Sequence, residues 1–447
     1  MRICLGALLL FVLSATNQRI VAQIRSDESK MKKDSIRKEM QRILDNEFKR
    51  WYPLSIDTVD GGFFSDINYK WEIEGVQNKM IVTQSRHVWA TSNAAQFYGD
   101  GDKFLTIARH GVDFLRDKMW DRRYGGFFNL VSKNGDPMNE SGRIVKQAYG
   151  NAFAIYGLAA YFKASGDSAA LNLAKETFHW LEQHSYDSEY GGYSQFISRE
   201  GNAFLDGYMG VPPKDQNSTI HLLEALTELY RVWPDSLLKE RLHSLLVLVR
   251  DTITTDKGTM VLFFKRDWTP VSFRQSSEAE REKNYEFDHV SFGHDIETAY
   301  LMLDASEALG IKNDFRTLAV AKKMIDHGLT YGWDKGRGGI FDGGYYLPGE
   351  NKPAIVRRTK EWWSQVEALN SFLMISQLYP NDDHRYFEKF CEQWEYCKQY
   401  VIDNEHGGWY WGGIDIVPDN KMSPKSTIWK CDYHTSRGLI NCIRRLK

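Results

Sequence analysis

The chain has 447 residues, 42% of them hydrophobic and 26% charged, which is the composition of a globular protein with a large core. A formal net charge of −2 excludes the strongly basic surface with which proteins bind nucleic acids or acidic membranes. Aromatic residues form 14% of the chain, a share that suits a helical core and also a cleft in which sugars stack on aromatic rings.

The first residues are typical of a secretory signal. Arg2 precedes an apolar run from Ile3 to Ala15, and small or β-branched residues lead on to Ala22. We therefore expect residues 1–22 to be a signal peptide and the mature protein to be exported, to the periplasm or outside the cell. No later segment has about 18 uninterrupted apolar residues, so we expect no membrane association once the signal is removed.

A Gly-Gly turn motif, followed by aromatic or β-branched residues, recurs along the chain. Full copies begin at Asp60, Tyr124, Tyr190, Arg337 and His406, and a degenerate copy begins at Asp256. Successive copies start 64 to 69 residues apart, except for one interval of 81 residues between Asp256 and Arg337. Because paired glycines allow positive φ angles, the motif predicts six tight turns, each followed by a short strand.

Between the turns, apolar residues recur at i, i+3, i+4 and i+7, which predicts amphipathic helices. In chain order the helices are expected at about 30–50, 83–99, 103–118, 146–164, 169–183, 217–232, 235–251, 293–309, 313–328, 360–378, 382–400 and 433–446. The first and last are unpaired and can complete each other, whereas the others form five pairs. We therefore predict an all-α fold, a closed (α/α)6 barrel built by residues 23–447 as one domain. An open α-solenoid is the alternative.

Side chains suited to chemistry occur at or near the start of each inner helix of these pairs. They are Arg86, Tyr149, Asn217, His221, His294, Glu297, Trp362, Trp363 and His434. If the inner helices run parallel, these side chains gather at one rim of the barrel, where helix N-termini add positive dipole ends. A single histidine at a helix start is usually a cap or a core residue. Three of them, at positions that look equivalent in three repeats, indicate a shared site.

The spacing His221-x-x-Glu224 recurs as His294-x-x-Glu297, which places an imidazole and a carboxylate on one helical face. One carboxylate per histidine can fix its tautomer, and four such groups could alternatively bind a metal ion. The chain lacks HExxH, Cys/His clusters, EF-hand loops and the glycine-rich motifs that bind phosphates. We therefore expect neither a metal ion nor a nucleotide.

Five segments in order along the chain form a recognisable set. They are Ser85-Arg86-His87-Val88-Trp89, the stretch from Asn217 to Ala225, Phe292-Gly293-His294-Asp295-Ile296-Glu297, the stretch from Glu361 to Ala368, and Trp429-Lys430-Cys431-Asp432-Tyr433-His434. This set resembles the cellobiose 2-epimerase family within the N-acylglucosamine 2-epimerase superfamily, whose fold is also the (α/α)6 barrel. The export signal is a departure, because most of these relatives are cytoplasmic.

The resemblance implies a cofactor-free isomerase that inverts C2 of the reducing-end aldose of a β-1,4-linked disaccharide, such as cellobiose, mannobiose or lactose. It implies ring opening and proton transfer through an enediolate, with His434 and His294 as acid and base at C2. His221 would assist ring opening and Arg86 would stabilise the oxyanion. The remaining implied contacts are hydroxyls held by Tyr149 and Asn217, His294 oriented by Glu297, and sugar rings stacked on Trp362, Trp363 and Trp429. The expected partner is the oligosaccharide substrate alone, with the protein a monomer or weak dimer.

Other functions are compatible with the same residues. An aldose–ketose isomerase would return the proton to C1, and an N-acylglucosamine 2-epimerase would use the same scaffold on another sugar. A glycoside hydrolase or lyase would require a carboxylate pair or a Tyr/His base at the rim. A glycan-binding protein without activity would need the tryptophans but not the three histidines.

Overall fold

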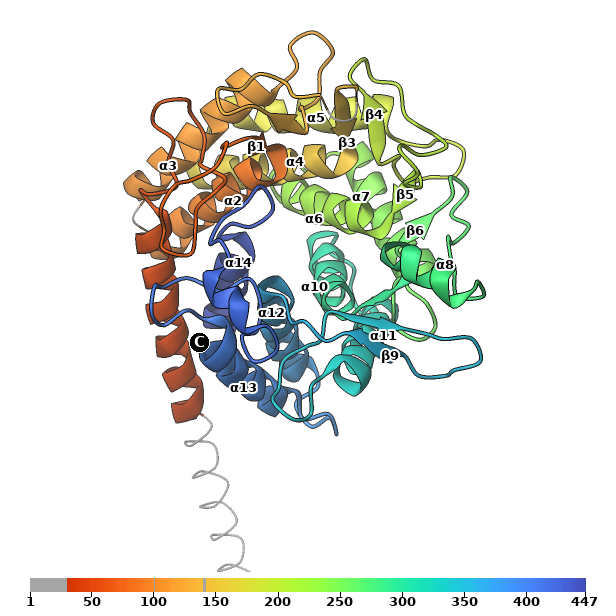
Figure 1. The fold of residues 1–447 in the computed structure, drawn as a ribbon. Helices are drawn as coiled ribbons and strands as arrows, with labels where there is room; N and C mark the ends of the chain where they lie inside the picture. The colour runs from red at the N-terminus through yellow and green to blue at the C-terminus, as the bar shows by residue number, and fades with distance from the viewer. Residues whose placement is uncertain (1–29, 100, 140–141) are drawn as a thin grey trace, which may run out of the picture.

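In the computed structural model, which describes residues 30–99, 101–139 and 142–447, two concentric rings of helices form a closed barrel (Figure 1). The expected signal peptide, residues 1–22, lies outside the described residues. The inner ring consists of α2 (Ile81–Tyr98), α4 (Ala148–Ser165), α6 (Gln216–Val232), α10 (Phe292–Ala308), α12 (Trp362–Leu378) and α14 (Tyr433–Arg445). The outer ring consists of the helix at 30–51, α3 (Gly101–Phe114), α5 (Ser168–His184), α7 (Ser236–Leu248), α11 (Phe315–His327) and α13 (Tyr386–Tyr396).

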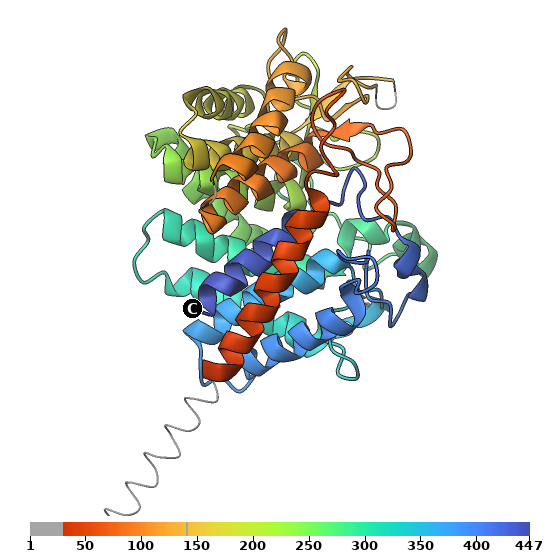
Figure 2. The ribbon, with the colours of Figure 1, turned by 90° about the vertical axis from the view of Figure 1, so that its left-hand side faces the viewer.

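The two ends of the chain close the rings. Helix α14 packs against α2, which completes the inner ring. The helix at 30–51 lies beside the C-terminal helices on the outside of the barrel (Figure 2), where Glu39 accepts hydrogen bonds from Trp394 of α13 and from Lys398, just after that helix. The prediction of a closed (α/α)6 barrel is confirmed, and the open solenoid is wrong.

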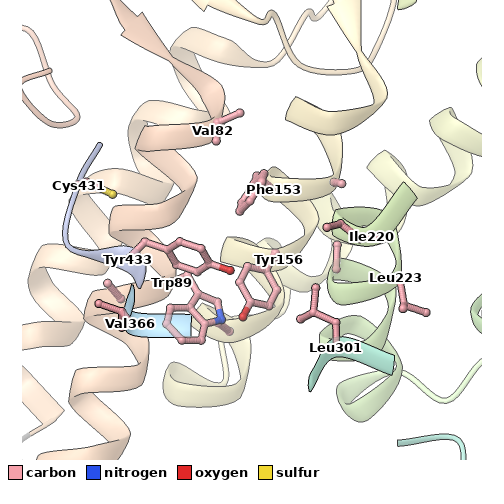
Figure 3. Packing of buried hydrophobic residues seen from close by; sticks show 14 of the residues in the cluster. Val82, Trp89, Phe153, Tyr156, Ile220, Leu223, Leu301, Val366, Cys431 and Tyr433 are labelled. Carbon is pink, nitrogen blue, oxygen red and sulfur yellow. The ribbon is translucent and has the colours of Figure 1, made fainter. Parts of the chain in front are cut away.

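The inner helices are buried on nearly every side, because they contact the outer ring on one face and each other across the barrel. In α4, every residue from Ala148 to Tyr161 is buried. Aromatic rings fill the barrel axis beneath the helix starts: Trp89 stacks on Tyr156 with ring centroids 5.2 Å apart, and both meet the edge of Tyr433 (Figure 3). No helix in the described ranges combines the length and apolar character needed to cross a membrane.

Short antiparallel strands link successive repeats at one end of the barrel. The strand before each of four inner helices pairs with a strand that follows the next Gly-Gly turn. The pairs are β1 (Lys79–Met80) with β2 (Leu130–Val131), β3 (Val145–Gln147) with β4 (Phe196–Ser198), β5 (Lys214–Asp215) with β6 (Phe263–Phe264), and β7 (Val290–Ser291) with β8 (Gly343–Tyr345), which also pairs with β9 (Ala354–Arg357). Each repeat is thereby fixed to the next one.

A buried lysine holds each regular turn against the following inner helix. It lies two residues before the helix, and its Nζ contacts both an aspartate carboxylate and the carbonyl of the first turn glycine. We call this arrangement the lysine clamp. The pairs are Lys79 with Asp57, Lys146 with Asp121, Lys214 with Asp187 and Lys360 with Asp334, at 2.8 to 3.1 Å. In the last repeat Lys425 pairs with Asp403 at 2.6 Å. The sequence analysis missed the clamp, although the lysine precedes four of the predicted inner helices.

The fourth repeat has no clamp. Thr255 stands where the aspartate lies in the other turns, and Val290 stands where the lysine lies, two residues before α10. The same repeat has the long interval noted in the sequence. Its extra residues include two short helices, α8 (Glu278–Lys283) and α9 (Tyr285–Asp288), which the sequence analysis did not predict.

Substitution of a clamp lysine should destabilise the whole barrel. Lys79→Met leaves the Asp57 carboxylate charged in a site where both side chains are completely buried, so we expect the free energy of unfolding to fall by about 3–5 kcal/mol. Adding Asp57→Asn removes the unpaired charge and should restore part of this loss. Urea unfolding measures the change, with Lys70→Met, an exposed lysine, as the matched control. Equal stability of the two single variants would contradict a structural role of the clamp.

Candidate active site

A polar pocket of about 330 Å³ lies at the N-terminal ends of the inner helices. All six inner helices contribute to it, which shows that their starts face the same end of the barrel. Its lining contains the ten residues proposed from sequence, namely Arg86, Tyr149, Asn217, His221, His294, Glu297, Trp362, Trp363, Trp429 and His434. Glu361 and Trp411 complete it and were not proposed.

The three histidines meet in this pocket, but they do not occupy equivalent helix positions as predicted. His434 is the second residue of α14, His294 the third of α10, and His221 the sixth of α6. Positions two and six are one helical turn apart on the same face, so His221 reaches the pocket from one turn deeper.

Two of the histidines are oriented by buried carboxylates. His434 Nδ1 lies 2.8 Å from Glu367 Oε1, and His221 Nδ1 lies 2.8 Å from Glu224 Oε2. Because a carboxylate accepts, each Nδ1 carries the hydrogen and each Nε2 keeps a lone pair that can accept a proton. Burial lowers the pKa of His434 well below the usual histidine range. Burial alone would raise the pKa of Glu224, but the Arg437 charge and the His221 hydrogen bond outweigh it and lower that pKa to about 2.

His294 differs from the other two histidines and corrects one prediction. Its Nδ1 lies 2.8 Å from Ser291 Oγ, whereas the carboxylate expected to orient it, Glu297, is bound by Arg437. A hydroxyl can donate to Nδ1, and the His294 ring can then carry its hydrogen on Nε2. Burial, together with the nearby His221, lowers the pKa of His294 to about 3.

Beneath the histidines, one guanidinium binds three carboxylates. Arg437 donates to Glu224, Glu297 and Glu367, which come from α6, α10 and α12, and all four side chains are buried. We call these four residues the arginine–carboxylate core. Arg437 Nε also donates to Glu367 Oε1 at 3.2 Å, the oxygen bound by His434. The sequence analysis missed Arg437, although it lies three residues after His434 and therefore on the same helical face.

Arg86 is held rigidly at the opposite wall of the pocket. Its Nη1 donates to the carbonyl of Trp429 at 3.0 Å and its Nη2 donates to Tyr149 Oη at 3.3 Å. The guanidinium carbon lies 4.5 Å from the centre of the Phe153 ring and 5.0 Å from that of Tyr433. These contacts leave a fixed positive charge that faces the pocket and can stabilise a developing oxyanion.

Trp363 contacts two of the histidines. Its ring centroid is 4.6 Å from that of His294 and 5.9 Å from that of His434, and its Nε1 donates to Glu361 Oε2 at 2.6 Å. Trp429 is 48% exposed and available to a ligand, whereas Trp362 is only 4% exposed and packs against Trp411. Stacking is therefore best served by Trp363 and Trp429.

The arrangement does not suit a metal ion. Ligand atoms of Glu297, Glu367 and His434 lie within 4.8 Å of one another. However, Arg437 donates to both carboxylates, so a cation bound there would face a fixed positive charge. Of the two His-x-x-Glu glutamates, Glu224 therefore binds both His221 and Arg437, whereas Glu297 binds Arg437.

The chain is similar to known carbohydrate epimerases over most of its length. The model of the N-acylglucosamine 2-epimerase (GlcNAc 2-epimerase) family matches residues 62–437. A cellobiose 2-epimerase of Bacteroides fragilis is 28% identical over 417 residues, covering 91% of this chain and 98% of that protein. One of Ruminococcus albus is 30% identical over 414 residues, covering 91% and 97%. The solved structure of a cellobiose 2-epimerase from Bacillus thermoamylovorans matches with a TM-score of 0.78 at 26% identity, covering 92% of this chain and all of that one.

Removing the guanidinium should unfold the centre of the barrel. Arg437→Met leaves three buried carboxylates without their shared counter-charge, so we expect the free energy of unfolding to fall by about 3–5 kcal/mol. Arg444→Met, on an exposed position of the same helix, is the control and should change stability by less than about 0.5 kcal/mol. The predicted difference is checked by denaturant unfolding at neutral pH, and similar midpoints for both variants would contradict it.

Proposed function

The chain belongs to the N-acylglucosamine 2-epimerase family of carbohydrate epimerases, and from this premise we propose that it inverts C2 of the reducing-end aldose of a β-1,4-linked disaccharide. The matches to cellobiose 2-epimerases over more than nine-tenths of the chain support the choice of a disaccharide such as cellobiose. The observation that carries the proposed chemistry is that His294 and His434 both line the pocket and both contact one indole, that of Trp363.

Inversion at C2 requires that this carbon lose its proton and regain one on the opposite face. The C2 proton becomes removable only when the sugar ring opens and the C1 aldehyde can delocalise the charge as an enediolate. One imidazole then takes the proton from one face of C2, and a proton is returned to the opposite face. Two histidines that flank a stacked sugar meet this requirement, since each can address a different face.

The neighbouring groups supply the other steps of this scheme. His221, oriented by Glu224, is placed to exchange a proton with the ring oxygen or the C1 hydroxyl during ring opening. The fixed charge of Arg86 stabilises the negative oxygen of the enediolate. Asn217 and Tyr149, which line the same pocket, hold hydroxyl groups, and Trp363 with Trp429 binds the sugar faces.

Replacement of His434 tests the proton-transfer role. His434→Asn keeps a polar side chain but removes the acid/base group, so we expect the epimerisation rate to fall by about 10²- to 10⁴-fold while cellobiose binding largely persists. Product NMR in D2O should show deuterium at C2 of the epimer formed by the wild type. The exposed His243→Asn is the matched control and should retain full activity. Undiminished epimerisation by His434→Asn would remove this residue from the mechanism, and a ketose as main product would assign the enzyme to aldose–ketose isomerases.

The lowered histidine pKa values predict the pH dependence of the reaction. A general base must be neutral, and its neutral fraction falls when the pH drops through its pKa. Because burial lowers the pKa of His434 and lowers that of His294 to about 3, the acidic limb of kcat/KM should lie below pH ~6.5, the ordinary histidine value. A profile of kcat/KM for cellobiose, measured from neutral pH downward through and below the ordinary histidine pKa, checks this expectation. A limb centred at or above the ordinary histidine pKa would contradict the neutral-imidazole arrangement.

A further inference from the structure

A groove of about 380 Å³ lies on the outside of the barrel, beside the third Gly-Gly turn. Its lining comes from the two arms of that turn, from the outer helix α7 and from the π-helical turn that follows α7, and it shares no described residue with the active-site pocket. We call it the tyrosine groove, after Tyr186, Tyr190 and Tyr193, which line it. Its volume falls within the range of about 300–1,000 Å³ that is usual for sites that bind small molecules.

One side chain of α7 is smaller than its counterparts in other repeats, and this difference leaves room for the groove. In three other turns an aromatic residue of the outer ring covers the first turn glycine, where an added Cβ would lie 3.1 Å from Phe114, 2.7 Å from Trp180 or 3.4 Å from Tyr396. Leu248 takes the place of Phe114 and Tyr396, since each of the three is the last α-helical residue before a π-helical turn. A Cβ on Gly191 would meet no described atom within 4 Å apart from its chain neighbours. The third turn therefore lacks the aromatic cover that these other turns have.

Two tyrosine rings of the groove are held in place and yet accessible. Tyr190 is 44% exposed, although the Arg266 guanidinium lies 5.3 Å from its ring centre and is itself bound by Asp187 at 3.0 Å. Tyr186 is partly exposed, and the Arg241 guanidinium lies 3.9 Å from its ring centre. Because both rings are already fixed, they can receive the C–H face of a sugar with little further loss of side-chain entropy.

The lining of the tyrosine groove suits a neutral ligand. Its arginine, Arg241, is paired with Glu182 at 2.7 Å and with Glu240 at 2.6 Å, so its charge is compensated within the protein. Exposed polar side chains of α7 and of the π-helical turn after it can form hydrogen bonds with hydroxyl groups. They are His243, Ser244 and Thr252. Aromatic faces beside such donors and acceptors match the alternating C–H and hydroxyl surface of a sugar.

We propose that the tyrosine groove is a second, non-catalytic carbohydrate site, which binds a β-1,4-linked chain of neutral hexosyl units. In a β-1,4-linked glucan the ring substituents are equatorial, so the chain is a flat ribbon whose C–H faces can pack on Tyr190 and Tyr186. The choice of linkage rests on the proposed function, because the proposed substrate is a disaccharide with this linkage. Binding to the chain would hold the enzyme close to the place where hydrolysis of that chain releases the disaccharide.

Two variants test the groove without touching the active site. Leu248→Phe introduces the aromatic residue that Phe114 provides in the first repeat and fills the groove, and Tyr190→Ala removes an exposed ring. Native electrophoresis through a gel that contains soluble glucomannan, a β-1,4-linked polymer of glucose and mannose, should retard the wild type. For each variant we expect the apparent association constant to fall about 10-fold or more, because aromatic anchors carry much of the binding energy of such contacts. Each long polymer chain has one reducing end, so the active-site pocket adds little to this retardation.

Tyr124→Ala is the matched control. Tyr124 has the place of Tyr190 in the second turn, and the Arg199 guanidinium lies 5.7 Å from its ring centre, but Tyr124 does not line the groove. This variant should be retarded like the wild type. Epimerisation of free cellobiose should be unchanged in all three variants, since none of the three residues lines the active-site pocket.

The outcomes separate the two proposals. A wild type that glucomannan does not retard, or equal retardation of the wild type and both groove variants, would overturn the tyrosine-groove inference and leave the proposed epimerase activity standing. A loss in Tyr124→Ala as large as in Tyr190→Ala would also overturn it, and so would equally strong retardation by soluble starch, an α-1,4-linked glucan. A wild type that binds glucomannan through the groove but epimerises no aldose would instead overturn the proposed function. Retardation of the wild type and the control, with the expected losses in the two groove variants, would support the inference.

Discussion

Arg437 lies on the last described helix, whereas the three carboxylates to which it donates hydrogen bonds lie on α6, α10 and α12. Until α14 docks against α2, these carboxylates face one another at the barrel axis without a counter-charge, and their mutual repulsion opposes closure. Docking of α14 therefore closes the inner ring and delivers His434 in the same step. The closed inner ring and the histidine site thus share one buried guanidinium, which contacts the carboxylate that orients His434.

The lysine clamps stabilise the rim of the barrel, as the arginine–carboxylate core stabilises its axis. Each clamp fixes a Gly-Gly turn against the start of an inner helix, and the polar residues of the pocket lie within the first two turns of those helices. A side chain such as Arg86 or Tyr149 is then positioned by the backbone on which it is mounted. Such rigid mounting is what proton transfer requires, because displacements of about 1 Å reduce rates strongly.

Periodicity made most of the architecture predictable. The turn spacing and the helical pattern located the long helices to within a few residues, and the helix starts identified nine of the ten proposed pocket residues, whereas Trp429 came from the family resemblance. The sequence did not predict in the same way which side chains of the pocket bind one another. Glu297 is three residues from His294, but Arg437, 140 residues away in sequence, binds its carboxylate instead. Spacing along a helix limits which side chains can contact each other. Which of these contacts form depends on the charged side chains that other helices bring to the same place. The clamps were missed for the same reason, since each joins a turn to the start of a helix in the next repeat.

The absence of a clamp in the fourth repeat has a consequence for how this barrel can diversify. In the clamped repeats, the turn and the next helix start are tied by a buried ion pair, so a change in the length of the intervening segment risks stranding a charge in the core. Val290 and Thr255 impose no such condition, because neither carries a charge that must find its partner. The stretch between β6 and Val290 can therefore change in length with little effect on the rings of helices, whereas β6 itself is fixed by its pairing with β5. Glu286 and His289 of this segment line a cavity that Trp363 also lines, so changes in its length can reshape the surroundings of the proposed active site while the three histidines keep their places.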